Sequence, residues 1–301
     1  MVPRPPYSPA MKLATFRDGS RGGQLAVVSG DLARACYASG IAATLQQALH
    51  DWNFIAPQLQ ALANELNGGH ARHAFAFDPA QCLPPLPATW QWAMAASAPA
   101  EGTVPEAAPP EIALAAGDTL RGPRAAMPAW PGALDFEPQL AAIVADVPRA
   151  ATPEQAQDAI RLLVLTCPLL LRDAPAADRH PATAVAAVAI TPDELGVAWQ
   201  DGAAHLTLQT SVNGRKTGLL DARRAWPLKH VIAASARTRA LSAGSLLGSG
   251  PAPATAGHAS LQARRASDLP ANWLQAGDTA HAQARTPDGA TPFGTIELQL
   301  T

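Results

Sequence analysis

The chain of 301 residues is long enough for one large β-rich domain, or for a small lobe beside a main domain. Nearly half of its residues are hydrophobic (48%) and only 15% are charged, so the chain can bury a sizeable core and general disorder is excluded. Its 22 Lys and Arg against 24 Asp and Glu give a net charge of −2, which leaves no basic excess to neutralise a phosphate backbone. We therefore expect a folded protein that does not bind nucleic acid.

Cysteine content and apolar runs indicate the compartment. Cys36, Cys82 and Cys167 form no CxxC pair, and an odd number cannot complete a disulfide framework, so we expect a reducing, cytoplasmic location. The longest apolar run, 162–171, contains Pro168 and is shorter than the ~18 residues of a membrane span. Residues 1–10 are rich in proline and lack the apolar core of a secretion signal. We expect them to form a disordered leader, with either Met1 or Met11 as the true start.

The first part of the chain predicts a small α/β lobe over residues 11–92. Two β-like runs, 12–16 and 24–29, flank Asp-Gly and Gly-Gly pairs, which favours a hairpin. From Thr44 to Leu66 apolar residues recur at helical spacing, and Gly68-Gly69 follows. This pattern predicts a helix with a break or kink at Pro57.

Residues 93–116 are mostly Ala, Pro, Ser, Gly and Glu without alternation, and we expect a poorly ordered linker there. The main domain is expected over 117–301. Thr152-Pro153 with Gln155 predicts a helix running to about residue 163, and a second helix is expected within 226–241. Continuous apolar or alternating runs, with Asn-Gly at 213–214 and Asp-Gly at 288–289, predict buried strands and hairpins. Strands outnumber helices, so the predicted class is α+β with a β-rich core.

Several segments, in their order along the chain, resemble the fumarylacetoacetate hydrolase family. They are Met-Lys-Leu-Ala-Thr-Phe at 11–16, Leu-Asp-Phe-Glu at 134–137, Pro-Ala-Thr at 181–183 with Thr-Pro-Asp-Glu-Leu-Gly at 191–196, Ala-Gly-Ser-Leu-Leu-Gly-Ser-Gly at 243–250, Gly-Asp-Thr at 277–279 and Phe-Gly-Thr-Ile-Glu at 293–297. The resemblance implies a mixed-sheet roll of the family's C-terminal type behind the small lobe. It also implies cleavage of a carbon–carbon bond in 2,4-diketo acids, as in aromatic compound catabolism, with Mg²⁺ or Ca²⁺ bound.

The family's site residues are substituted at most matching positions. Glu137 matches the first carboxylate of the Glu-x-Glu pair, but Gln139 stands at the second. The trailing Arg172 of the next motif fits, whereas Pro168 occupies its ligand Asp position. The Lys position reads His180, the Thr position after Gly250 reads Pro251, and no His lies between His73 and His180. Cation affinity in such sites follows the number of charged ligands, so no tightly bound cofactor is expected; Mg²⁺ or Ca²⁺ is expected only if the family site is retained.

The role of several candidate site residues can be interpreted in two ways. Glu137 is either a surviving metal ligand or a polar residue beside a strand. His180 either replaces the Lys as an oxyanion donor or is a solvated loop residue. His258 with Ser260 is either a base and nucleophile or an unrelated pair. Cys167, in an apolar strand, is expected to be a buried, inert thiol.

Three hypotheses about function follow from these substitutions. The first is a catalytically silent member of the family, a pseudoenzyme subunit that forms a homodimer or a heterodimer with an active relative. The second is a metal-dependent hydrolase of diketo acids with a degraded or relocated site. The third is a metal-free binding module that holds a small organic acid through residues such as Arg172.

Overall fold

The computed structural model describes residues 10–101, 103, 105, 107–267 and 271–301, so the predicted leader lies outside the described residues except for Ala10. The helices are α1 (Leu45–His50), α2 (Trp52–Asn67), α3 (Pro153–Asp158), α4 (Leu228–Ser235) and α5 (Leu261–Ala266), with 3₁₀ turns η1 (Pro79–Gln81), η2 (Pro192–Ala198) and η3 (Ala222–Arg224). The strands of the N-terminal third are β1 (Lys12–Phe16), β2 (Gln24–Val28), β3 (Arg34–Tyr37), β4 (Phe75–Ala76), β5 (Cys82–Leu83) and β6 (Trp92–Ala95).

Those of the middle third are β7 (Ile112–Ala115), β8 (Leu120–Arg121), β9 (Ala126–Met127), β10 (Leu134–Phe136), β11 (Gln139–Val144), β12 (Ile160–Leu171), β13 (Thr183–Val185), β14 (Val188–Ile190) and β15 (Trp199–Gln200). The last strands are β16 (Ala203–Ala204), β17 (Thr207–Val212), β18 (Arg215–Asp221), β19 (Leu246–Gly248), β20 (Ala254–Gly257), β21 (Thr279–Arg285) and β22 (Thr295–Leu300).

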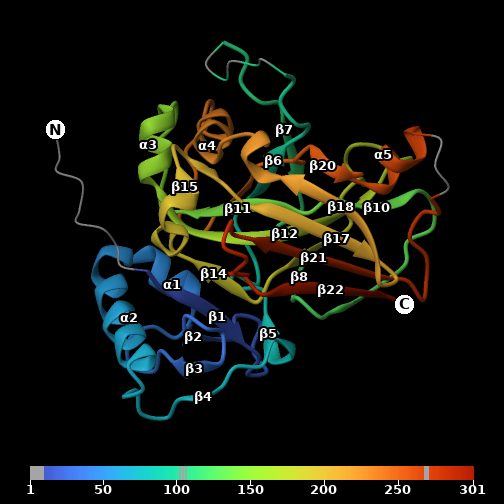
Figure 1. Ribbon diagram of the computed structural model, residues 1–301. Helices are drawn as coiled ribbons and strands as arrows, with labels where there is room; N and C mark the ends of the chain where they lie inside the picture. The colour runs from blue at the N-terminus through green and yellow to red at the C-terminus, as the bar shows by residue number, and fades with distance from the viewer. Residues whose placement is uncertain (1–9, 102, 104, 106, 268–270) are drawn as a thin grey trace.

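One large mixed sheet runs through both parts of the chain. The described residues form a 14-stranded sheet whose main path is β4-β3-β2-β1-β14-β12-β11-β19-β6-β7. The lobe joins the main domain where β1 pairs with β14 in antiparallel register, so that Lys12 lies opposite Ile190. A second, six-stranded sheet has the order β20-β18-β17-β21-β22-β9. Figure 1 shows the small lobe in blue beside the strand-rich main part, and the predicted α+β class is confirmed.

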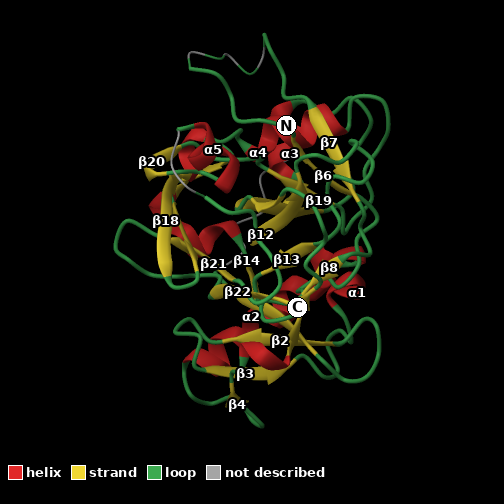
Figure 2. Cartoon of the chain, turned by 90° about the vertical axis from the view of Figure 1, so that its right-hand side faces the viewer, coloured by secondary structure: helices red, strands yellow, loops and turns green. Residues whose placement is uncertain are grey.

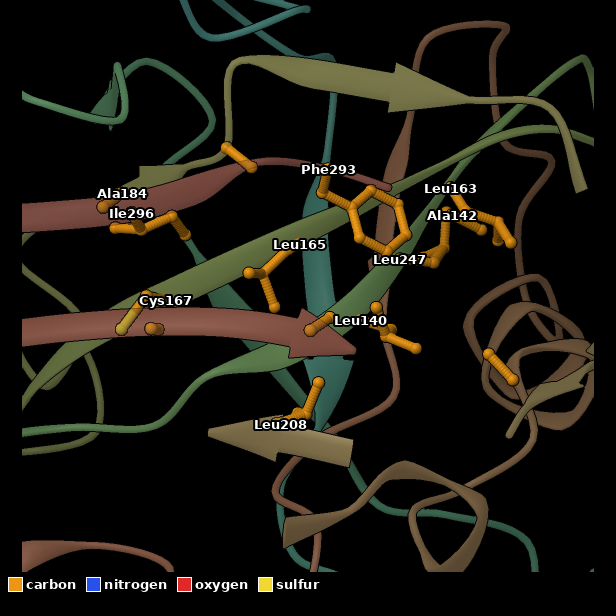
Figure 3. Close-up of a cluster of buried hydrophobic side chains, with 14 of the residues drawn as sticks. Leu140, Ala142, Leu163, Leu165, Cys167, Ala184, Leu208, Leu247, Phe293 and Ile296 are labelled. Atoms are coloured by element: carbon orange, nitrogen blue, oxygen red, sulfur yellow. The ribbon is translucent and has the colours of Figure 1, made fainter. Parts of the chain in front are cut away.

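The core lies largely between the two sheets. Figure 3 shows Leu140 of the large sheet near Leu208 of the small one, Leu163 beside Phe293, and Ile296 of the small sheet beside Ala184. Each of these side chains is at most 3% exposed. Burial of this kind stabilises a fold by about 25 cal/mol per Å² of apolar surface. Every second residue of β17 and β22 points inward, as the period of a half-buried strand requires.

A second core joins the small lobe to the opposite face of the large sheet. The helices α1 and α2 cover the lobe's strands, and Leu45, Leu59 and Leu66 are buried there. In Figure 2 this lobe lies at the bottom of the molecule, with α2 beside β2 and β3. The expected interruption of the helical segment is real, but it falls at Asp51, whose φ of −119° and ψ of 37° separate the helices, and not at Pro57. Pro57 lies inside α2, so its expected break is wrong.

Hairpin signals predicted the strands well. Asn213 and Gly214 have φ values of 50° and 74° between β17 and β18, which is the left-handed pair that a tight hairpin turn requires. The hairpins of β1 with β2 and of β21 with β22 are also present. The second helix of the main domain is shorter than its expected range and is α4.

Two expectations about irregular and helical segments are wrong at the ends of those segments. The stretch 93–116 was expected to be a poorly ordered linker, but its ends belong to β6 and β7, which pair with each other in antiparallel register, while the described residues between them form no helix or strand. The helix that starts at Thr152 ends at Asp158, and the apolar run from Ile160 is strand β12. β12 pairs along its length with β10, β11, β13 and β14, so its burial on both faces explains its largely apolar sequence.

Candidate functional site

Three polar residues lie on one face of a continuous ribbon. β10 and β11 both pair antiparallel with β12, so that Asp135 lies opposite Leu170 and Gln139 opposite Thr166. Between β10 and β11, the Glu137 amide donates a hydrogen bond to the Pro168 carbonyl, so Glu137 lies opposite Pro168 in the same register against β12. Because side chains alternate along a strand, Asp135, Glu137 and Gln139 point to the same side. Pro168 therefore lies directly across from Glu137.

Arg172 binds both carboxylates of this face. Its Nε and one terminal nitrogen donate to Asp135 Oδ2 at 3.0 and 2.9 Å. The same terminal nitrogen contacts Glu137 Oε1 at 2.5 Å. The Asp135 side chain is fully buried, whereas those of Glu137 and Arg172 are 17% and 19% exposed. The cluster thus lies at the edge of the core with its carboxylates directed to the guanidinium.

The electrostatics of the cluster follow from this arrangement. Burial raises the pKa of Glu137, and the neighbouring Arg172 only partly opposes that effect. Burial disfavours the charge of Arg172, but Glu137 and Asp135 outweigh it and raise the pKa of the guanidinium. Cys167 is 1% exposed, and burial followed by the charges of Asp135 and Glu137 raises the pKa of its thiol. The structure therefore supports the predicted inert thiol at this position.

Gln139 is held as a core amide. Its side-chain oxygen accepts a hydrogen bond from the Gly250 amide at 2.6 Å, and its nitrogen donates to the Met94 sulfur at 3.2 Å. The residue is 1% exposed. A Cβ at Gly248 would lie 2.4 Å from the Gln139 oxygen, which shows how closely β19 packs against it. The space around the position of the second carboxylate is filled by protein.

His180 lies in the loop before β13, as one interpretation expected, but its side chain is half-buried. Its Nδ1 is buried and has no hydrogen-bond partner among the described residues. Burial, followed by the charges of Arg179 and Arg172, lowers the pKa of His180 to about 4. The imidazole is therefore neutral near pH 7, so it cannot supply the positive charge of a Lys at this position.

The remaining candidates do not assemble into a site. The Ser260 hydroxyl accepts a hydrogen bond from the Ala263 amide and so caps α5. No hydrogen bond joins the side chains of His258 and Ser260 in the part of the chain that the structure describes, so the base and nucleophile interpretation gains no support. Pro251 has no side-chain donor or acceptor.

The side chains of this face do not fit a divalent cation. A hard cation needs several oxygen ligands, usually with more than one carboxylate. Here Glu137 contacts Arg172, the Gln139 oxygen accepts from Gly250, and Pro168 has no ligand atom in its side chain. Within the described residues no group of three or more His, Cys, Asp or Glu side chains is placed to hold a metal ion.

The sequence did not predict several residues that pack around the polar side chains of β10 and β11. Asp135 was noted only as part of a motif, although it accepts five hydrogen bonds. Met94 and Trp92 fell at or inside the predicted linker, yet both are buried in β6, where the Trp92 indole donates to Thr183 Oγ1 at 3.0 Å. The one available signal was the pair of tryptophans at 90 and 92, because large aromatic residues are uncommon in linkers.

Two family models match almost the whole chain. Residues 11–88 match the family model described as fumarylacetoacetase N-terminal domain 2, and residues 91–301 match that of the fumarylacetoacetate hydrolase C-terminal domain. No curated protein sequence matches at a significant level. Among the helices that the structure describes, none is long and apolar enough to cross a membrane.

Solved structures share the fold at low sequence identity. A fumarylacetoacetate hydrolase of Exiguobacterium antarcticum has a TM-score of 0.72 at 16% identity, and the match covers 97% of this chain and 99% of that one. A putative HpcE protein of Mycobacterium smegmatis has a TM-score of 0.70 at 17% identity over 97% and 100% of the two chains. Maleylpyruvate hydrolase of Sphingobium sp. SYK-6 has a TM-score of 0.68 at 18% identity over 97% and 99%, and one of its structures holds manganese(II) and pyruvate.

Proposed function

Because this chain belongs to the fumarylacetoacetate hydrolase family, we propose that it is a catalytically silent member, which keeps the hydrolase fold without the metal-dependent cleavage. The observation that carries the proposal is the ribbon of β10, β11 and β12. There Glu137 faces Pro168, and its side chain contacts Arg172. Asp135, the second acidic side chain of that face, bonds to the same guanidinium.

The chemistry of the relatives cannot be rebuilt from these parts. A divalent ion in such a site polarises the substrate and stabilises developing negative charge, which contributes several kcal/mol. A general base contributes a factor of about 10² to 10⁴ in rate. Both carboxylates of this face, Glu137 and Asp135, are already paired with Arg172, and His180 is neutral. Both contributions are therefore missing together.

We propose that the chain acts as an assembled subunit, as a homodimer or beside an active relative. The apolar strand 206–212 offers no surface to a partner through Leu206 and Leu208, because these side chains are 3% and 1% exposed within the chain's own core. Analogy with the family is therefore the support for a dimer. The mass of the purified protein in solution tests it. Cys36, Cys82 and Cys167 are buried free thiols, which supports a cytoplasmic location.

The organic-acid hypothesis gains no support from Arg172. A ligand carboxylate would have to displace Asp135 or Glu137 from the guanidinium. Displacing Asp135 would leave a fully buried carboxylate without its counter-charge, which is a costly state. We therefore do not propose a binding function at this residue.

Acylpyruvate turnover with added Mg²⁺ or Mn²⁺ tests the proposed function. We expect no metal-dependent loss of the substrate's enol absorbance, and we expect the Glu137→Gln variant to give the same background. Turnover approaching an ordinary enzyme's ~1 to 10³ s⁻¹ that Glu137→Gln abolishes would contradict the proposal. The double variant Gln139→Glu with Pro168→Asp is the matched gain-of-ligand test, and we expect it to bind Mn²⁺ more tightly than the unmodified protein.

A further inference from the structure

Strand β7 ends the main path of the large sheet. Within the described residues it pairs with β6 alone, in antiparallel register, so that Met94 lies opposite Ala113. Figure 2 shows β7 beside β6 and β19 at the upper end of the molecule. In the part of the chain that the structure describes, the other side of β7 therefore has no strand beside it, and its backbone groups there are available for pairing.

The ladder with β6 fixes which backbone groups of β7 point outward. The Ala96 amide donates to the Glu111 carbonyl at 2.9 Å, so these two residues form a hydrogen-bonded pair. Bonded and non-bonded pairs alternate in an antiparallel ladder, so Ala113 also bonds to β6. The amides and carbonyls of Ile112 and Leu114 consequently point away from β6. β7 thus presents two donors and two acceptors along its free side.

The side chains at this edge are apolar and unprotected. Leu114 is 55% exposed, and Trp90, just before β6, is 68% exposed. The Thr89 amide donates to the Gly117 carbonyl at 3.0 Å, which places Trp90 beside the C-terminal end of β7. Residues 112–116 contain no charge and no proline, and the pairing with β6 has no bulge. Because edge strands usually carry such protection against pairing, an exposed apolar edge without it indicates a partner strand.

We propose that β7 pairs with β7 of a second copy of this chain, antiparallel about a two-fold axis that passes between the two Ala113 residues. Ile112 of each copy then faces Leu114 of the other, and the outward groups of both residues form four hydrogen bonds across the axis. Opposite side chains lie on the same face of a sheet, so the exposed Leu114 covers the half-buried Ile112 of the other copy. Ile112 already packs against the buried cluster of Ala95 and Val231, so the new pair extends an existing core.

A second copy suits this edge because the pairing is self-complementary. The small side chain at Ala113 allows the close approach of about 4.5 Å between Cα atoms that a non-hydrogen-bonded pair requires. Glu111, the charged residue at the start of β7, falls opposite Ala115 of the other copy, so the two glutamates lie roughly 13 Å apart along the strands. A specific interface buries about 800 Å² on each partner, so the surface around the strand, including Trp90, must take part as well. The inference rests on the proposed assembly as a subunit, and it assigns the surface and commits the assembly to a homodimer.

Light scattering coupled to size-exclusion chromatography tests this surface on the full chain at micromolar concentration. The unmodified protein should have twice the 31.1 kDa mass of one chain. Leu114→Lys places a charge on the edge and should give the mass of one chain. Its circular dichroism spectrum should be unchanged, because the Leu114 side chain is largely exposed. Val197→Lys, at a valine of η2 that is 87% exposed, is the matched control and should remain a dimer.

A cross-link tests the register of the pairing. In the two-fold arrangement the thiols of Ala113→Cys face each other at a Cα separation of about 4.5 Å, which a disulfide permits. Mild oxidation should therefore give a covalent dimer on a non-reducing gel. The native thiols Cys36, Cys82 and Cys167 are buried, so the unmodified protein should give none. Val197→Cys, at a more exposed position, should also run as a single chain.

Two results would overturn the inference on different grounds. If the unmodified protein has the mass of one chain, both this surface and the proposed assembly are wrong. If it is a dimer that Leu114→Lys leaves intact, only this surface is wrong. Should Leu114→Lys fail to fold, the Ala113→Cys cross-link decides: its presence supports the pairing and its absence overturns it. None of these measurements depends on acylpyruvate turnover, so the proposed lack of cleavage is decided separately.

Discussion

Gln139 differs from a glutamate by a single nitrogen, and that nitrogen suits its surroundings. The amide oxygen accepts from Gly250, and the nitrogen is directed at the Met94 sulfur, which can only accept. A carboxylate here would place its second oxygen against that acceptor, inside a core where unpaired charge is costly. The amide thus satisfies a buried position that a ligand carboxylate could occupy only with a cation beside it.

His180 gives a pH-dependent stability whose sign can be worked out. Burial lowers its pKa to about 4 in the folded protein, against 6.5 for the ordinary group, so the unfolded chain binds more protons between these values. The stability is complete above pH 6.5 and is lost as the pH falls toward 4. The span corresponds to about 3 kcal/mol at most, at 1.36 kcal/mol per pH unit.

Urea unfolding between pH 4 and 7.5 measures this contribution. The unmodified protein should lose stability on acidification more steeply than the His180→Gln variant, which has no titrating ring. His70→Gln, at an exposed histidine of the small lobe, serves as control and should leave the slope unchanged. Parallel curves for the unmodified protein and His180→Gln would show that the ring is solvated and titrates normally.

At the scale of the elements, capping and turn residues in the sequence predicted where helices begin better than where they end. Thr152 and Gln155 form the predicted capping box at the start of α3, but the end of that helix depends on β12. Sheet pairing with β11 begins at Ile160, and a residue cannot keep a helical backbone while it forms that ladder. The expectation of a linker over 93–116 was wrong at its start for a related reason. β6 is held by its parallel pairing with β19, a contact between segments more than 140 residues apart.

The capping box makes a clear prediction for α3. The Thr152 hydroxyl accepts from the Gln155 amide, and the Gln155 side chain accepts from the Thr152 amide at 3.0 Å. Thr152→Ala should lower the free energy of unfolding by about 1 kcal/mol, because it leaves an amide of the first turn unpaired. Thr238→Ala, at an exposed threonine outside any helix, should change it by less than ~0.5 kcal/mol. Equal effects of both substitutions in urea unfolding would refute the role of the cap.

At the scale of the whole molecule, the sequence was most informative about the fold. The ordered motifs and the glycine-containing turns predicted the family, the class and most hairpins. What the sequence could not show is which side chains bind each other across that ribbon. The contacts of Arg172 with Asp135 and Glu137, and of Gln139 with Gly250, depend on rotamers and on strands brought together from distant segments.

An ion pair connects the small lobe to the main domain. Lys12 on β1 forms an ion pair with Glu194 of η2, and their side chains are only 6% and 14% exposed. Lys12→Met would leave Glu194 without its partner at a half-buried position, which should cost up to about 3 kcal/mol. Adding Glu194→Gln removes the unpaired charge and should recover much of that loss.

The exposed pair of Arg124 and Glu297, at 43% and 48% exposure, is the control, and Arg124→Met should cost less than ~1 kcal/mol. Because β1 and β14 belong to one sheet, the lobe and the main domain should unfold together in every variant. Far-UV circular dichroism and tryptophan fluorescence should therefore report the same midpoint in urea. A biphasic curve for Lys12→Met, with the lobe unfolding first, would mean that the ion pair, more than the shared sheet, couples the two parts.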